Sequence, residues 1–368
     1  MRAVLVGGGH AHVHVLKLLG EQRPPGARLT LVARDVQTPY SGMIPGFVAG
    51  HYRFADCHID LAKLCAARGI ELIHGEAIGL DRVRRRVLLV DKQAVDYDLL
   101  SIDVGSAPNL DAIRGAAQWA IPVKPIAELG RRWLAFLDQA RTRRGPLAIA
   151  VIGGGAGGVE LALAIDHRLR SIAKDATLRI ALIARDEILP GHAPAARRRL
   201  RAILKRRGIA LHEHTTAIAI ERDGVRLQDA ASLEADAVFM VTQAAPAPWF
   251  AATGLPLDEQ GFLAVEATLR SPGDPCIFAA GDCATVLDHR RPKAGVYAVR
   301  QGPPLAANLA RALAGEAPLP FVPQRRHLAI IGTGDGRAVA TRGWWAVEGR
   351  WVWRWKDHID RRWMAQYR

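Results

Sequence analysis

Glycines that follow apolar runs are the residues of this sequence whose spacing indicates a chemistry most clearly. Gly153, Gly155 and Gly158 satisfy the pattern GxGxxG directly after the apolar run at 148–152, and Glu160 lies two residues further on. In such a pattern the first glycine permits a tight turn, the second lets the backbone approach a diphosphate, and the third brings helix and strand close together. The following helix presents its positive N-terminus to the anion. The pattern therefore predicts a dinucleotide site.

A second, incomplete copy of the pattern opens the chain. Gly7 and Gly9 follow a short apolar run, but His12 stands where the third glycine belongs. A histidine at that position predicts a looser contact between helix and strand. His10 and Ala11 lie at the expected start of the helix and are candidate contacts of a second dinucleotide.

The alternating histidines of this segment raise an alternative, a metal site, because His10 and His14 lie one helical turn apart. No cluster of carboxylates or thiols accompanies them in the sequence, and the segment opens a helix that is expected to bind a nucleotide. Packing or cofactor contact is therefore favoured over metal binding, and no metal site is predicted.

The second strand of each unit lacks the acidic residue that usually binds a ribose at its end. Ala33 and Ala184 stand there, and they are followed by Arg34 and Arg185. Arg185 suits a 2′-phosphate better than a bare ribose and so favours NADPH over NADH, with a solvated arginine at a strand end as an equal alternative. Arg34 is a candidate contact of the first dinucleotide.

The elements that must position these glycines are found in the same stretches. Residues 3–6, 10–19 and 29–32 read as strand, helix and strand, and residues 148–152, an apolar helix and residues 178–183 repeat that order. Each is a βαβ unit with parallel strands and a right-handed crossover. The sequence predicts an α/β fold with two Rossmann-like dinucleotide-binding domains.

Composition limits the class of protein further. The chain has 368 residues, of which 49% are hydrophobic and 23% charged, and these values argue against disorder. Its net charge of +14 attracts every kind of anion. Because the case for nucleic-acid binding rests on this charge alone, nucleic acid is not predicted as a partner. No stretch approaches the roughly 20 apolar residues of a membrane span, and no signal peptide precedes the first strand. A cytoplasmic location is expected.

Three further stretches resemble motifs of one flavoprotein superfamily. Residues 98–108 resemble the strand "DYLVIATGSxP", residues 236–243 resemble its counterpart in the nicotinamide domain, and residues 276–284 are similar to "IFAxGDxA". With the glycine turns, these motifs make the chain similar to the FAD-dependent pyridine nucleotide-disulfide oxidoreductase superfamily. The resemblance implies FAD and NAD(P)H as cofactors, and it implies that Asp282 binds the ribityl chain of the flavin.

Within that superfamily, residues 38–46, 292–302 and 355–362 resemble type II NADH:quinone dehydrogenases, sulfide:quinone reductases and the flavoprotein module linked to selenide, water dikinase. In these relatives the stretch after Lys293 begins a helix whose N-terminus faces the flavin ring and the quinone site. Such a helix end stabilises negative charge on a reduced flavin. Lys293 is the candidate catalytic residue, with a surface lysine as the equal alternative.

The predicted cofactor-binding residues form two sets. FAD is expected at Gly7, Gly9, His10, Ala11, Arg34, Ser41, Gly42, Ala77, Gly105, Gly281, Asp282, Lys293 and Ala294. The nicotinamide nucleotide is expected at Gly153, Gly155, Gly158, Glu160 and Arg185. Hydride would pass from the second set to the first, with the cofactors carrying the redox chemistry.

The resemblance also implies a domain order. Residues 1–114 and 244–317 form the FAD-binding domain, residues 115–243 form an NAD(P)H-binding domain inserted into it, and residues 318–368 form a small C-terminal α+β domain.

The electron acceptor stays open at this point. Val296 and Arg300 stand where the quinone-site glutamines of type II enzymes would fall, and the cysteine pair of sulfide:quinone reductases has no counterpart. A quinone-like acceptor is the first hypothesis. The alternatives are reduction of a sulfur or selenium species, in association with selenide, water dikinase, and a flavin-carrying redox sensor or adaptor. A homodimer is a further expectation.

The C-terminal stretch is rich in tryptophan and basic residues, with Trp344, Trp345, Trp351, Trp353, Trp355 and Trp363. Aromatic residues beside cations are typical of an anchor at a membrane interface, and the type II relatives use their C-terminal region in this way, on the inner membrane surface. The alternative is a hairpin and helix packed over the flavin domain. Because the aromatics partly alternate as they would along a strand, the packed alternative is favoured.

Overall fold

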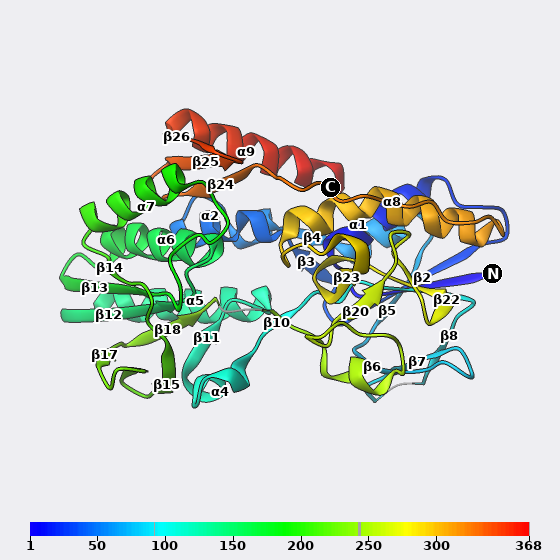
Figure 1. Cartoon of the computed structure of the whole chain (residues 1–368), viewed down its shortest axis with the longest axis horizontal. Helices are drawn as coiled ribbons and strands as arrows, with labels where there is room; N and C mark the ends of the chain where they lie inside the picture. Colours follow the sequence, from blue (N-terminus) through cyan, green and yellow to red (C-terminus); the bar gives the residue numbers. More distant parts are fainter. Residues whose placement is uncertain (92, 242–243, 368) are drawn as a thin grey trace.

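The computed structural model describes residues 1–91, 93–241 and 244–367. Two α/β units lie side by side, and a smaller third unit lies across them (Figure 1). Both larger units are built on sheets of mainly parallel strands, so the predicted α/β class with two Rossmann-like units is confirmed.

The first unit is built on a six-stranded sheet in the order β21-β22-β9-β1-β2-β5, parallel except for the edge strand β21. Its strands are β1 (Arg2–Val6), β2 (Arg28–Ala33), β5 (Glu71–His74), β9 (Leu99–Ile102), β21 (Arg270–Ser271) and β22 (Asp274–Ala279). Val4 and Leu5 of the central strand are fully buried, as expected for a parallel strand that is covered on both faces.

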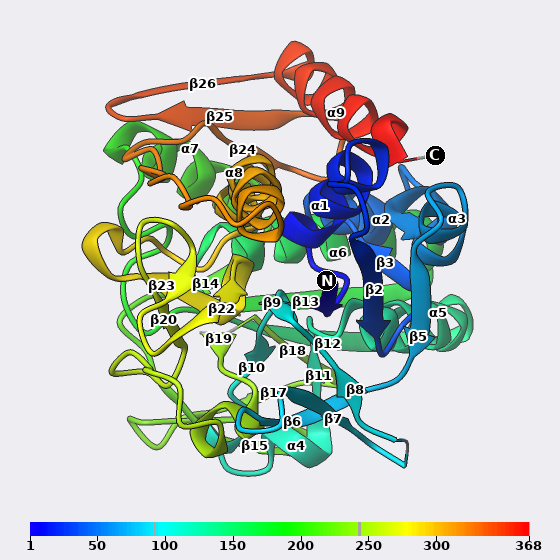
Figure 2. The same ribbon diagram turned by 90° about the vertical axis from the view of Figure 1, so that its right-hand side faces the viewer.

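Two long helices cover one face of this sheet side by side, α1 (His10–Glu21) and α8 (Gly295–Leu313) (Figure 2). The remaining elements of the unit are short. They are β3 (Gln37–Pro39), α2 (Ile44–Ala49), β4 (His58–Asp60), α3 (Leu61–Ala66), β6 (Ala77–Asp81), β7 (Arg86–Leu89), β8 (Val95–Asp96), β20 (Leu263–Val265) and β23 (Ala284–Val286). Strands β6, β7 and β8 form a meander on the face opposite α1 (Figure 2).

The second unit is built on a five-stranded parallel sheet in the order β11-β18-β12-β13-β14. Its strands are β11 (Ala120–Pro122), β12 (Gly145–Ile152), β13 (Ala176–Ile183), β14 (Ala210–His212) and β18 (Ala237–Met240). Its helices are α4 (Ala116–Trp119), α5 (Ile126–Thr142), α6 (Ala156–Ile172) and α7 (Pro194–Arg206). A meander of β15 (Ala217–Glu221), β16 (Gly224–Leu227) and β17 (Ser232–Glu234) completes it.

The chain passes between the two units where β10 (Ala107–Pro108) pairs with β19 (Ala244–Ala245). The predicted domain boundary at Gln243, and with it the end of the motif at 236–243, lies outside the described residues. The four predicted domain ranges remain predictions.

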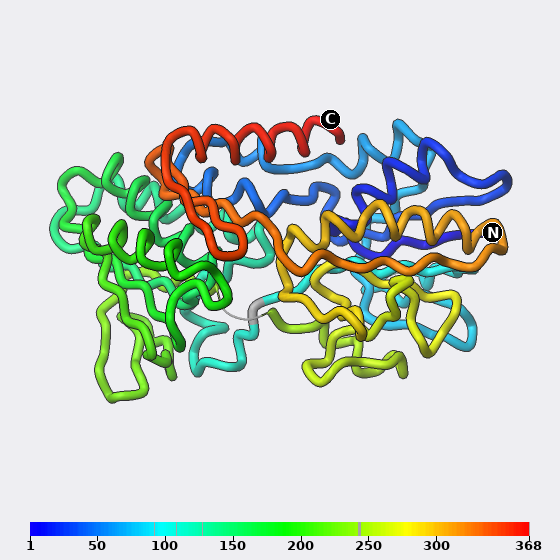
Figure 3. The backbone as a smooth tube through the Cα atoms, turned by 45° about the horizontal axis from the view of Figure 1, so that its top comes forward, coloured from blue at the N-terminus to red at the C-terminus, as the bar shows by residue number. Residues whose placement is uncertain are grey.

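The third unit is an antiparallel sheet of β24 (Ala329–Gly332), β25 (Ala338–Arg342) and β26 (Trp345–Gly349), followed by α9 (Arg350–Met364). Its sheet contacts α6 and α7 of the second unit, while α9 runs toward the first unit (Figure 3). The strand-like reading of the tryptophans at 351, 353 and 355 is wrong, because all three lie in α9. Their spacing of two fits a helix as well, since residues four apart share one of its faces.

Among the residues that the structure describes, no helix combines the length and the apolar character needed to cross a bilayer.

Candidate functional site

The second glycine turn has the close packing that the sequence pattern predicts. A Cβ on Gly158 would overlap the carbonyl oxygen of Gly153, so α6 can approach β12 this closely only with a glycine there. The space beside Gly155 is open, and no side chain among the described residues accepts a hydrogen bond from the first-turn N–H groups of α6. The N-terminus of this helix is therefore available to a diphosphate.

The first glycine turn has a buried histidine in place of the third glycine. Nδ1 of His12 lies 2.6 Å from the carbonyl oxygen of Gly7, and Nε2 lies 2.8 Å from Oγ of Ser101. Burial lowers the pKa of His12 to about 4, so the ring is neutral at pH 7 and only one nitrogen carries a proton. Because a carbonyl only accepts, Nδ1 donates to Gly7 and the Ser101 hydroxyl donates to Nε2. An imidazole ring thus joins α1 to the turn after β1 and to strand β9.

Asp103, which directly follows β9, caps the N-terminus of α1. Its Oδ2 accepts hydrogen bonds from the backbone N–H groups of Ala11 at 2.9 Å and His12 at 3.0 Å, two donors that have no partner within the helix. A Cβ on Gly9 would overlap this carboxyl group. Burial raises the pKa of Asp103 to about 7, although the two hydrogen bonds act in the opposite direction.

Several residues predicted to bind FAD meet beside His10. The backbone N–H of Ser41 donates to Nε2 of His10 at 3.4 Å, and a Cβ on Gly295, the first residue of α8, would lie 2.8 Å from Oγ of Ser41. Burial lowers the pKa of His10 to about 4, and the nearby charge of Asp282 partly opposes this. The predicted FAD site beside His10 is therefore surrounded by the N-termini of α1 and α8, the Ser41 loop and Asp282.

Asp282 has a partner that comes from the other unit. Nζ of Lys124 lies 2.7 Å from Oδ2 of Asp282 and 3.2 Å from Oγ of Ser106. Lys124 belongs to the connection between β11 and α5, whereas Asp282 lies in the short turn after β22, and Gly105 precedes Ser106 in the turn after β9. This ion pair joins the two units at the predicted flavin site.

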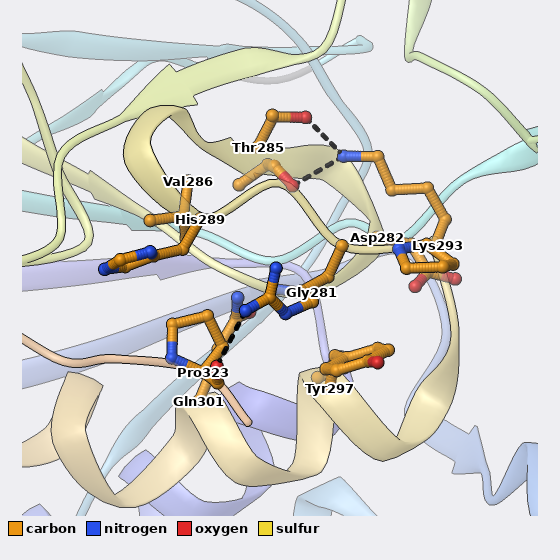
Figure 4. Close-up of a pocket in the computed structure, with 13 residues that line it drawn as sticks. Gly281, Asp282, Thr285, Val286, His289, Lys293, Tyr297, Gln301 and Pro323 are labelled. Atoms are coloured by element: carbon orange, nitrogen blue, oxygen red, sulfur yellow. Dashed lines mark hydrogen bonds between the residues drawn. The ribbon is translucent and has the colours of Figure 1, made fainter. Parts of the chain in front are cut away.

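Lys293, the candidate catalytic residue, is bound to strand β23. Its Nζ donates to the carbonyl oxygen of Ala284 at 2.6 Å and to Oγ1 of Thr285 at 2.7 Å (Figure 4), and it lies 4.1 Å from the centre of the Phe262 ring. Burial lowers its pKa. A small pocket adjoins it, lined by residues that include Gly281, Asp282, Thr285, Tyr297 and Gln301. Ala294 occupies the N-cap position of α8, directly before its first residue.

The arginines at the strand ends are exposed and paired. Arg34 lies 3.1 Å from Asp35 and 3.8 Å from Glu76, and Ala77 directly follows Glu76 at the start of β6. The structure thus brings Arg34 and Ala77, two predicted FAD contacts, to the same end of β2. In the second unit, Arg185 follows β13 in the same way and lies 3.3 Å from Asp186.

Glu160 points toward the third unit. Its Oε1 accepts a hydrogen bond from the backbone N–H of Gly332 at 2.8 Å. Burial raises its pKa to about 7, and the charge of Lys356 opposes this shift. The side chain of Glu160 is surrounded by Pro45, Gly46, Ala49, His51, Ala164, Gly334 and Trp353. The hydrogen bond to Gly332 joins the carboxyl group of Glu160 on α6 to strand β24 of the third unit.

Helix α9 covers the loop that contains Ser41 and Gly42. Nζ of Lys356 donates to the carbonyl oxygen of Gly42 at 2.6 Å and to Asp360 at 2.8 Å. The ring of Trp363 stacks on Tyr40, with centroids 4.2 Å apart. The inner face of α9 is thus packed over the first unit, as one of the two alternatives for the C-terminal stretch predicts.

All four cysteines are free thiols. Burial raises the pKa of Cys57 and Cys283 to about 12 and that of Cys65 to about 11. Within residues 1–91, 93–241 and 244–367, no three side chains of the types His, Cys, Asp and Glu are grouped to hold a metal ion.

The sequence pattern of the pyridine nucleotide-disulphide oxidoreductases matches residues 1–302. The chain belongs to this family. Membership confirms the superfamily that the motifs resemble, the enzyme class of an FAD-dependent NAD(P)H oxidoreductase, and the two cofactors FAD and NAD(P)H.

Two curated relatives match most of this oxidoreductase. The NADH dehydrogenase-like protein YutJ of Bacillus subtilis is 25% identical over 90% of this chain and 89% of its own. Demethylphylloquinone reductase NdbB of Synechocystis is 26% identical over 78% of this chain and 72% of its own.

Solved structures show the same fold. The sulfide:quinone oxidoreductase of Aquifex aeolicus has a TM-score of 0.82 at 19% identity, covering 98% of this oxidoreductase and 90% of the solved chain. NDH2 of Plasmodium falciparum, solved in complex with NADH, has a TM-score of 0.80 at 15% identity, covering 98% and 97%.

Asp103 and Lys124 were not among the site residues predicted from the sequence. Asp103 carried a signal, since it is an acid directly after a buried strand, where the motif that it resembles has the small apolar residue of "ATG". Lys124 carried none, because it lies far along the chain from Asp282 and meets it only where the two units pack together.

Proposed function

We propose that this oxidoreductase passes a hydride from NAD(P)H to FAD and that the electrons reduce a quinone. The observation that carries the proposal is the pair of glycine-lined helix N-termini, at α1 and α6, in units that the Lys124–Asp282 ion pair joins. Relatives named for quinones, the demethylphylloquinone reductase and the sulfide:quinone oxidoreductase, support the choice of acceptor.

The residues around α1 fit FAD. The turn at Gly9 leaves no room for a Cβ, and Ser41, Asp282 and the N-terminus of α8 meet beside it. When bound there, FAD would supply hydride acceptance and onward electron transfer. The N-terminus of α8 at Ala294 and Gly295 would stabilise negative charge at this place. Lys124 holds the carboxylate of Asp282 in position.

The residues around α6 fit the nicotinamide nucleotide. The open space beside Gly155 and the available N–H groups of the first turn suit a diphosphate. Arg185, exposed after β13, suits a 2′-phosphate. In this assignment the two nucleotides approach each other across the junction that Lys124 spans.

The state of the three buried thiols favours a quinone over a sulfur or selenium species. A thiol attacks such a species as the thiolate, whereas burial raises the pKa of Cys57, Cys65 and Cys283 to between about 11 and about 12. These three side chains therefore stay protonated at neutral pH and are poorly suited to a sulfur relay.

Anaerobic reduction of the purified holoprotein tests the proposal. NADH or NADPH should bleach the flavin absorbance, and a water-soluble quinone should restore it faster than polysulfide or selenite does. A holoprotein that neither nucleotide bleaches would contradict the nicotinamide assignment, and recovery only with polysulfide or selenite would contradict the quinone. As a control, Gly155→Asp places a carboxylate at the N-terminus of α6, and it should retain FAD while bleaching slows at least about tenfold.

The outer face of α9 supports the predicted peripheral association with a membrane. Large apolar side chains are exposed along this helix and on the adjoining hairpin, namely Trp344, Trp351, Trp355 and Ile359. Arg350, Arg354, Arg361 and Arg362 are exposed beside them. Aromatic residues flanked by cations favour the interface of an anionic bilayer, which is also where a lipid-soluble quinone is found.

Sedimentation with vesicles of phosphatidylglycerol and phosphatidylcholine tests this association. Trp355→Ala should lower the bound fraction severalfold, whereas Trp119→Ala should not, because Trp119 lies on α4 with a matching exposed fraction, 39% against 38% for Trp355. Equal effects of the two substitutions, or no binding by the unaltered protein at low salt, would contradict it.

A further inference from the structure

The two helix N-termini differ in the residue that follows the neighbouring central strand. Asp103 in the first unit and Val241 in the second occupy equivalent positions, since the N–H of Asp103 donates to Val6 at 2.8 Å and the N–H of Val241 donates to Ile152 at 2.8 Å. The second helix therefore has an aliphatic side chain beside its glycine turn, and the first helix has a carboxyl group.

This carboxyl group lies between two turns that are assigned to FAD. It accepts from Ala11 and His12 on one side, and a Cβ on Gly281 would overlap its Oδ1 on the other. A diphosphate drawn to the N-terminus of α1 therefore meets an acidic group that already occupies two of the N–H donors of the first turn.

We propose that binding of FAD at α1 is coupled to protonation of Asp103, so that the complex holds this residue as a neutral carboxylic acid. The inference rests on the proposed function, which places FAD at α1. A carboxylate and a diphosphate compete for the same positive helix end and repel each other strongly where water is excluded. Above neutral pH, each FAD that binds therefore takes up one proton from solvent, and Oδ1 or Oδ2 of Asp103 receives it.

The groups around Asp103 indicate that Asp103 receives the proton taken up when FAD binds. Burial raises its pKa to about 7, and the charge of Asp282 adds to the rise. Around it, α1 presents His10 and His12, whose pKa burial lowers to about 4. The turn after β22 presents Cys283, whose pKa burial raises to about 12, and Asp282, which is paired with Lys124.

Helix α8 presents uncharged groups to the surroundings of Asp103. Ala298 lies beside Gly281, and Oε1 of Gln301 accepts a hydrogen bond from the N–H of Gly281 at 2.6 Å. Asp103 is thus the carboxyl that contacts the first turn of α1, and its pKa of about 7 lies within the range from pH 6 to pH 9. Below this pKa most of the carboxyl is neutral before FAD binds, and well above it the dissociation constant of FAD should rise about tenfold with each pH unit.

The test measures release of FAD from the purified holoprotein, by the rise of flavin fluorescence on dilution, between pH 6 and pH 9. The dissociation constant of the unaltered protein should rise about 25-fold between pH 6.5 and pH 8.5. Asp103→Asn, which keeps an acceptor for the N–H groups of α1, should bind FAD with a constant that does not change with pH. Glu160→Gln removes a carboxyl outside the FAD set whose pKa burial also raises to about 7, and it should keep the slope of the unaltered protein.

The outcomes separate the inference from the function on which it rests. A flat profile for the unaltered protein, or a slope that persists in Asp103→Asn, overturns the inference and leaves the assignment of FAD standing. A protein that holds no FAD at any pH overturns the assignment itself. If Asp103→Asn does not fold, titration calorimetry of the unaltered protein in two buffers decides: uptake of about one proton per FAD at pH 8 supports the coupling, and uptake of none overturns it.

Discussion

The two nucleotide-binding turns of this oxidoreductase build the same strand, turn and helix with different chemistry. At α6, Gly158 lets the helix approach the backbone of Gly153, and Val241 leaves the helix N-terminus without an internal anion. At α1, His12 joins helix to strand through hydrogen bonds, and Asp103 caps the helix. The comparison teaches that a glycine pattern reports how closely the backbone packs. How strongly the helix end attracts an anion depends on what else reaches it.

Gly158→Ala should have the largest effect on this comparison. Its Cβ would overlap the carbonyl oxygen of Gly153, and backbone on both sides leaves little room for adjustment. We expect the free energy of unfolding to fall by more than about 4 kcal/mol, measured by urea denaturation. A loss below about 1 kcal/mol would show that the close approach at α6 is not needed.

His12→Ala should have the next largest effect, a loss of about 2–4 kcal/mol at pH 7.5, because it opens a cavity and leaves the oxygens of Gly7 and Ser101 without their partner. The pKa of His12 is lowered from 6.5 to about 4. The folded protein therefore binds fewer protons in that range, and the stability due to the neutral ring is lost as the pH falls from 6.5 toward 4. The deficit of the variant should shrink over the same range, and a deficit that is constant with pH would contradict the neutral ring.

Val241→Asp would transfer the acidic group to the second turn. Its carboxylate would compete with the diphosphate at α6, so binding of NAD⁺ should weaken at least about tenfold at pH 8, measured by calorimetry on the holoprotein. The control Val241→Asn introduces a side chain of nearly the same size and polarity as aspartate but without its charge. It should weaken NAD⁺ binding much less than Val241→Asp does. Equal losses in the two variants would mean that shape, and not charge, separates the two turns.

Arg185→Ala should have the smallest effect. If the exposed guanidinium contacts a 2′-phosphate, the ratio of kcat/KM for NADPH over NADH should fall by about threefold to tenfold, as expected for an exposed ion pair. Arg34→Ala, at the corresponding place of the first turn, should leave that ratio unchanged. An equal fall of kcat/KM with both nucleotides would contradict a role for Arg185 in the preference.

Much of this arrangement could be predicted from local sequence. The two βαβ units follow from apolar runs and glycines that are close in the chain, and the observed elements extend the predicted ones by only a few residues, as with α1, which ends at Glu21 and not at residue 19. The helical state of the tryptophans at 351, 353 and 355 could not be predicted in this way, because a spacing of two fits both a strand and a helix. Contacts such as Lys124 with Asp282 depend on how distant segments pack, and no local pattern encodes them.

The central sheet of the first unit also has a consequence for synthesis of the protein. Strand β9 pairs with β22, although about 170 residues, including the whole second sheet, separate Ile102 from Asp274. At roughly 5–20 residues per second, a ribosome would deliver β22 about 10–30 s after β9. During that interval the edge of β9 is open to pairing with other chains, so the nascent protein should depend on chaperones until its first sheet closes.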